Sequence, residues 1–153
     1  MGEPPAAVIR EIADREAGSQ DVEVLAVDLK GSGSRQLVRV VVDRKGGVPL
    51  DVCQRISQGM SRELDAVDPI GGRYTLEVSS PGLDWPLADR AAFDRVEGRD
   101  VLIHRRDTGG GVEQLRGRVV HAGPDTVDID HGRDGTVAVA YDDIVKAEQA
   151  LPW

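Results

Sequence analysis

The sequence predicts an α+β protein made of two small domains. In the first half, apolar residues recur at helical spacing in two stretches and alternate at strand spacing in others. The second half holds several short alternating stretches separated by turn residues, which is typical of a small β-barrel. A segment rich in proline and glycine lies between them and fits neither pattern. We therefore expect an N-terminal α+β domain at 1–80, a rigid joint at 81–87 and a barrel domain at 88–153.

The first half predicts the order helix, strand, strand, helix, strand. Near the start, Val8, Ile9 and Ile12 fall on one face of a helix. Two strands then follow, joined by the short turn 31–34, so we expect an antiparallel hairpin. The remaining elements are a second helix and a third strand, expected at 51–66 and 74–79. Two helices can cover one face of such a sheet, which gives an α+β sandwich.

Alternation sets the expected faces of the two hairpin strands. In the first strand, which begins at Glu23, we expect Leu25, Val27 and Leu29 to share one face. In the second strand, expected at 37–43, the valines at even positions share a face. Both strands therefore offer an apolar row to the expected helices.

The second half predicts one short helix at 87–96 and then β-structure. The expected strands are separated by glycine-rich and aspartate-rich turns, and they lie at 101–104, 115–122, 126–130, 136–141 and 144–148. Closing these strands into a barrel would remove exposed sheet edges, so we expect a small closed barrel.

The joint continues a strand that ends in a rigid, non-repetitive stretch. Pro81 and Pro86 fix their φ angles and cannot donate a hydrogen bond, and Gly82 allows a turn with positive φ. We expect this segment to fix the angle between the domains, and its candidate residues are Ser79, Ser80, Pro81, Gly82, Leu83 and Asp84.

Residues 76–84 read Leu-Glu-Val-Ser-Ser-Pro-Gly-Leu-Asp, and Pro86 and Leu87 follow. This stretch is similar to the signature of the RimP family of bacterial ribosome maturation factors. The family pattern has Arg where this chain has Trp85, so one positive charge is missing at the joint. The order of the first half also resembles the prokaryotic KH module, although the Gly-X-X-Gly loop of that module is absent. The second half resembles the SH3-like or Sm-like barrel of the RimP family.

The resemblance implies a non-enzymatic assembly factor, expected to be monomeric and cytoplasmic. Such a factor would bind the immature small ribosomal subunit and promote its maturation, with a basic small-subunit protein near the decoding centre as the partner of the barrel. Direct contact with rRNA stays open. An alternative is an Sm-like regulator that binds free RNA, which would need a basic groove and exposed aromatic side chains. Aromatic residues make up only 3% of the chain.

The charge distribution favours a basic protein partner over free nucleic acid. The net charge is −8, and the two halves carry −4 each. Solubility alone would explain the same charge. The expected partner face consists of barrel carboxylates, namely Asp125, Asp128, Asp142 and Asp143. If RNA is contacted in the first half, the candidates are Arg44 and Lys45, as phosphate contacts, although an ordinary solvated loop is the favoured interpretation of this segment.

No pattern in the sequence predicts catalysis, a cofactor or a metal site. Cys53 is the only cysteine and is expected to be a small core residue. The three histidines, His104, His121 and His131, lie on separate elements and form no close pair. No apolar run is long enough for a membrane span, and no signal-peptide pattern is present.

Overall fold

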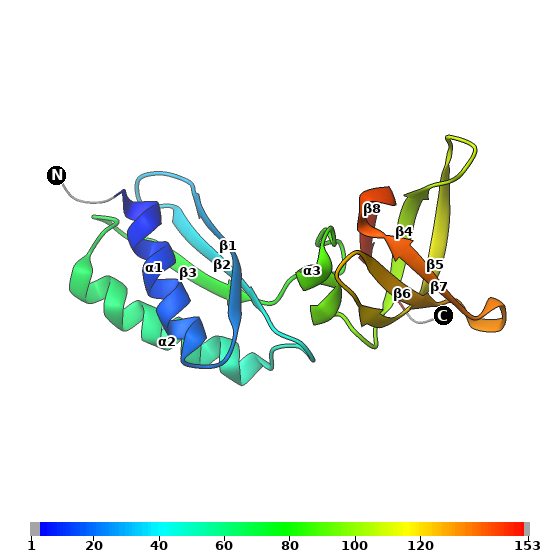
Figure 1. The fold of residues 1–153 in the computed structure, drawn as a ribbon. Coiled ribbons are helices and arrows are strands. Elements are labelled where there is room, and N and C mark those ends of the chain that lie inside the picture. The colour runs from blue at the N-terminus through cyan, green and yellow to red at the C-terminus, as the bar shows by residue number, and fades with distance from the viewer. Residues whose placement is uncertain (1–3, 152–153) are drawn as a thin grey trace. The chain divides into compact units, whose positions relative to one another are not determined.

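The structure is a computed structural model that describes residues 4–151 (Figure 1). The chain divides into two compact units, Met1–Pro81 and Gly82–Trp153. The first unit is a mixed sheet with two long helices, and the second is an antiparallel sheet with one short helix. The expected α+β class is therefore confirmed.

The first unit has the predicted order of elements. They are α1 (Pro5–Gly18), β1 (Glu23–Lys30), β2 (Gln36–Asp43), α2 (Leu50–Val67) and β3 (Tyr74–Ser79). The strand order is β1-β2-β3, with β1 antiparallel and β3 parallel to β2. The parallel pair requires a long crossover, which α2 supplies. Both helices bury their apolar faces against Val38, Val40 and Val42 of β2, which are fully buried.

A β-bulge changes the faces expected for β1. The pairing with β2 shifts register between Val24 and Ala26, which leaves Leu25 as the extra residue. Val24 and Val27 consequently both pack into the core, whereas the expected row placed Leu25 there. Strict alternation could not reveal this shift, because a bulge inverts the faces on one side of it.

The second unit places five strands around one core. It contains α3 (Arg90–Arg95), β4 (Asp100–Arg106), β5 (Val112–Ala122), β6 (Thr126–Asp130), β7 (Thr136–Ala140) and β8 (Ile144–Gln149), with short 3-10 turns η1 (Gly132–Asp134) and η2 (Tyr141–Asp143). All neighbouring strands are antiparallel, in the order β7-β6-β5-β4-β8. Phe93 of α3 is fully buried in this core, and Tyr141 lies against it with ring centroids 6.0 Å apart.

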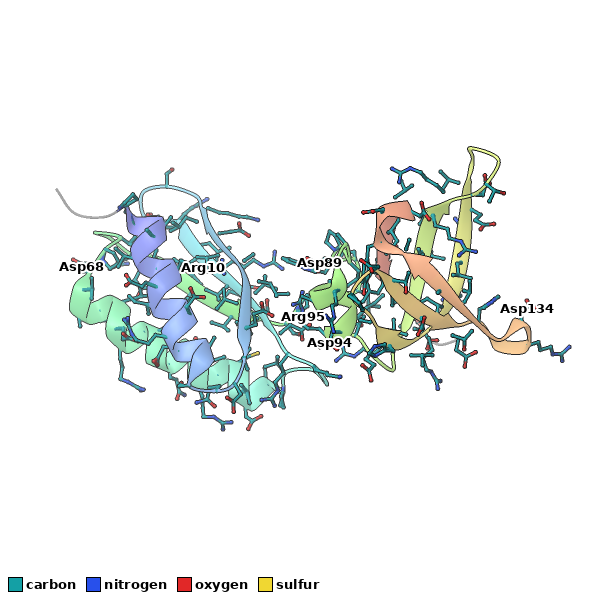
Figure 2. The ribbon with its side chains drawn as sticks, in the orientation of Figure 1. Arg10, Asp68, Asp89, Asp94, Arg95 and Asp134 are labelled. Atoms are coloured by element: carbon teal, nitrogen blue, oxygen red, sulfur yellow. The ribbon has the colours of Figure 1, made fainter. Side chains whose placement is uncertain are left out.

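The expected closed barrel is not formed. Within residues 4–151, β7 and β8 have no ladder between them and remain the two edges of the sheet. The 3-10 turn η2 redirects the chain between β7 and β8, and β8 pairs with β4 instead. The helix expected at 87–96 is also shorter, because Asp89 caps α3 by accepting a hydrogen bond from the Ala92 amide at 2.9 Å (Figure 2).

Candidate functional site

The segment expected to be the joint begins on the sheet of the first unit. Ser79 is the last residue of β3 and is paired with Val41 of β2. Its Oγ is buried and has no hydrogen-bond partner among the described residues. A buried hydroxyl without a partner costs roughly 1–3 kcal/mol of desolvation free energy, so Ser79 is an unfavourable polar position at the start of the joint. Ser80 and Pro81 follow, outside the ladder.

The far end of the segment is attached to the second unit by its backbone. The Leu83 carbonyl accepts a hydrogen bond from the Gln149 amide at 3.1 Å, and the Leu87 amide donates to the Ala147 carbonyl at 2.9 Å. Both partners belong to β8. The Leu87 side chain is buried in the core of the second unit. Residues from Leu83 onward are thus fixed to the second unit.

Gly82 differs from the expectation for its conformation. The Trp85 amide donates to the Gly82 carbonyl at 3.1 Å, so a turn is present. However, Gly82 does not have the positive φ that the sequence suggested. A Cβ at this position would lie 2.8 Å from Oδ1 of Asp84, the end of an exposed side chain that can rotate away, so a left-handed backbone does not explain the glycine and the contact is easily relieved.

The four candidate acidic residues are divided between two places on the second unit. Asp125 and Asp128 lie near Tyr141. The Tyr141 amide donates to the backbone carbonyl of Asp125 at 3.2 Å. The charge of Asp128 helps to raise the pKa of Tyr141, after the larger effect of burial. Asp142 lies beside Tyr141 in η2. Asp143 instead lines a separate hollow of about 320 Å³ together with side chains of β4.

Arginines that the sequence analysis did not single out lie close to this acidic face. Arg106 donates from Nη1 to the Asp142 carbonyl at 2.6 Å. Arg105 forms an ion pair with Glu113 across the β4–β5 ladder at 2.8 Å. Both arginines line the same hollow as Asp143. The face is therefore of mixed charge, which only the pairing of distant strands reveals.

In the loop proposed for phosphate contact, Arg44 donates hydrogen bonds to backbone carbonyls of the first unit. Arg44 donates from Nε to the Gly47 carbonyl at 3.0 Å and from Nη1 to the Gln20 carbonyl at 3.3 Å. Gly46 and Gly47 both have positive φ, which explains why glycine occupies these positions. Arg44 thus stabilises the loop before α2. A phosphate contact by Arg44 or Lys45 stays a prediction.

Comparison with protein-family models gives a match to the RimP N-terminal domain over residues 12–84. The matched range runs from the middle of α1 through β3 and ends at Asp84, so it includes the signature stretch from Leu76. Over residues 12–84 the chain carries a RimP N-terminal domain, which supports membership of the RimP family. RimP proteins are ribosome maturation factors with a role at the small subunit, and the family is not known as an enzyme family.

The RimP match assigns the first unit and the start of the joint. Residues 85–153 lie outside it, so the layout of the second unit rests on its strands alone. The RimP N-terminal domain accounts for the two-helix, three-stranded arrangement. The buried Ser79 hydroxyl lies inside the matched range, five residues before its end at Asp84.

Two features of the described residues bear on metal binding and on thiol reactivity. Between residues 4 and 151, no group of three His, Cys, Asp or Glu side chains is placed to hold a metal ion. Cys53 is buried, and burial raises the pKa of its thiol and so lowers the population of the reactive thiolate. No helix in the described part of the chain is long and apolar enough to cross a membrane.

Proposed function

We propose that this chain binds the immature small ribosomal subunit in the cytoplasm as a monomer and promotes its maturation. The observation that carries the proposal is the RimP N-terminal domain match, which ends within the signature stretch. The factor binds an incomplete conformation of the subunit more tightly than the mature one and thereby shifts the population towards productive assembly.

The joint sets the geometry with which the two units meet the subunit. Its backbone is paired up to Ser79 and is bonded again from Leu83. Few torsions remain free between these anchors, and Pro81 fixes one of them. Restricting the joint in this way lowers the entropy that is lost when both units bind one particle.

The second unit has an SH3-like layout and binds a basic small-subunit protein near the decoding centre. Support for the layout comes from the order β7-β6-β5-β4-β8 and from the 3-10 turn before the last strand. The acidic groups around Tyr141, including Asp125, Asp128 and Asp142, attract Lys and Arg side chains of that partner. Asp143 extends the face at its own hollow. The first unit has KH-like order and carries any rRNA contact.

Sedimentation of cell extract on a sucrose gradient tests the proposal. The protein should travel with free small subunits and be absent from assembled ribosomes. The variant Pro81→Ala should weaken binding to purified immature subunits roughly two- to fivefold, because this proline restricts the joint by about 0.4–1 kcal/mol.

The matched control is Pro5→Ala, a proline of the first turn of α1 that lies outside the joint. It should leave subunit binding unchanged. Protein found only in the soluble fractions at low and moderate salt would contradict the assembly role. Tight binding of the full chain to free RNA, with none to subunits, would favour the Sm-like regulator.

A further inference from the structure

The two edges of the first sheet differ in how they are protected against further pairing. On β1, the bulge at Leu25 disrupts the edge, and Arg10 of α1 donates from Nη2 to the Val24 carbonyl at 3.1 Å (Figure 2). A bulge and a covering charged side chain are common ways to block an edge strand. The start of the β1 edge is therefore protected against an added strand.

Within the described residues, the edge of β3 has neither a bulge nor a charged side chain bonded to its backbone. Its six residues pair with β2 in continuous register, without a bulge. On the other side of the strand, no backbone hydrogen bond to another described segment is present. A regular edge of this kind leaves N–H and C=O groups free to pair with an extended chain.

A hollow of about 450 Å³ runs beside this free edge, between β3 and α2. Its helical wall is formed by Ser57, Ser61 and Asp65, which follow one another at four-residue intervals along α2. The serine side chains are small, and neither hydroxyl makes a hydrogen bond within residues 4–151. The wall therefore leaves room and offers unused polar groups.

The floor of the hollow has apolar surface that is only half covered. Tyr74 and Leu76 line it, and both pack against the first core while remaining partly exposed. Val78, the next residue on this face of β3, is also half-buried. A strand added at the edge would cover these side chains, which is favourable at about 25 cal/mol per Å² of apolar surface.

The charges at the hollow select a cationic ligand. Asp65 lies in the wall, and Asp68 follows at the end of α2 (Figure 2), where the helix dipole adds negative potential. Burial, followed by the charges of Asp65 and Asp68, raises the pKa of Tyr74, so both carboxylates act on the hollow. Arg73 is the one cation among the lining residues. Phosphate groups would be repelled along most of this wall.

We propose that the groove between α2 and the free edge of β3 binds an extended basic peptide segment of a protein, which pairs with β3 as a fourth strand. The segment spans about six residues, the length of β3. Small or apolar side chains at alternate positions contact Leu76, and a Lys or Arg reaches Asp65. This site lies wholly within the first unit and is distinct from the acidic face of the second unit.

A phage-displayed library of random ten-residue peptides, selected against the full chain, tests the proposal. Enriched peptides should contain Lys or Arg and lack proline in their central residues. Ser61→Trp fills the groove and should weaken the selected synthetic peptides about tenfold or more. Gln58→Trp carries the same change to an exposed position of α2 that does not line the hollow, and it should have no effect.

Two further measurements keep the test independent of folding. Asp65→Asn leaves the groove open and should weaken binding only about two- to fivefold, as expected for an exposed ion pair. Peptides methylated at alternate backbone nitrogens should lose binding, since the strand pairing needs those N–H groups. No enriched peptide, equal binding to the Ser61→Trp and Gln58→Trp variants, or displacement of the peptides by single-stranded oligouridine would each overturn the proposal. Sedimentation of the Ser61→Trp variant with small subunits is measured separately, so that failure of the peptide site and failure of the assembly role can be told apart.

Discussion

The two units bury their cores in different ways. In the first unit, two helices cover one face of a three-stranded sheet, and the fully buried side chains are aliphatic residues and Met60. In the second unit, a sheet of five strands surrounds Phe93, which comes from a helix of only six residues. The fully buried residues of the first core are thus all aliphatic or methionine, whereas the second core adds one large aromatic ring to its aliphatic residues.

Truncating Phe93 should have the largest effect on this comparison. Phe93→Ala should destabilise the second unit by about 3–5 kcal/mol, because the short α3 cannot close the cavity that remains. A unit of this size has little more stability than that, so it should unfold. Both tryptophans lie after Gly82, so tryptophan fluorescence reports on the second unit, and circular dichroism at 222 nm reports mainly on α1 and α2.

Val120→Ala is the matched control, since the Val120 side chain is 47% exposed on β5. It should change the free energy of unfolding of the second unit, measured in urea by fluorescence, by less than about 1 kcal/mol. A Phe93→Ala variant whose fluorescence transition matches that of Val120→Ala would show that the aromatic ring contributes little to the stability of the second core.

Two glycines, one in each unit, test how tightly the units are packed, with smaller expected changes in stability. A Cβ at Gly117 of β5 would lie 2.5 Å from the Asp130 carbonyl oxygen and 2.6 Å from Cγ2 of Ile129, so the backbone of β6 must move. A Cβ at Gly59 of α2 would contact only the end of the Glu16 side chain, which can rotate away. Gly117→Ala should therefore cost about 1–3 kcal/mol.

Gly59→Ala should be close to neutral, because alanine gains about 1 kcal/mol over glycine in a helix and offsets the movement of Glu16. Urea midpoints for both variants, by fluorescence for Gly117 and by circular dichroism for Gly59, test the pair. Equal losses at the two glycines would mean that the helix pair is as tightly packed as the sheet.

Local patterns were sufficient to predict the order and approximate bounds of the elements. Helical spacing identified α2, and alternation identified β3, because each pattern depends on neighbouring residues alone. The bulge at Leu25 and the failure of β7 to pair with β8 depend on contacts between distant strands. Such contacts have no local signal, so both were predicted wrongly.

The same reason limits the prediction of the candidate sites. The signature at the joint is continuous in the sequence and could be recognised directly. In contrast, the placement of Arg106 beside Asp142 joins β4 to η2, and the hollow beside β3 joins α2 to an edge strand. Ser61 carries no sequence signal, because a serine on a helix is ordinary until its neighbour across the groove is known.

The smallest expected effect is on the pH dependence of stability, which a change at Glu16 should alter in the first unit and not in the second. Glu16 of α1 is half-buried and shares a hydrogen bond with Glu63 of α2, which in turn is paired with Arg15 at 2.5 Å. Burial first, and then Glu63, raises the pKa of Glu16. The folded state therefore favours the protonated carboxyl, so its stabilising contribution is present below the usual glutamate pKa and is lost as pH rises through the raised value.

Glu16→Gln should remove that loss, because glutamine is neutral at every pH and can still donate to Glu63. The free energy of unfolding, measured in urea at 222 nm, should equal that of the unchanged chain near pH 4. At pH 7 it should be higher by less than about 1 kcal/mol, since the site is partly solvated. Glu11→Gln, on the exposed side of α1, should leave the pH dependence unchanged. The fluorescence midpoint should not respond, because Glu16 lies in the first unit and the tryptophans lie in the second. A lower midpoint for Glu16→Gln at pH 7 would show that the carboxylate stabilises the helix pair through Arg15 and Arg62, whose charges oppose the shift.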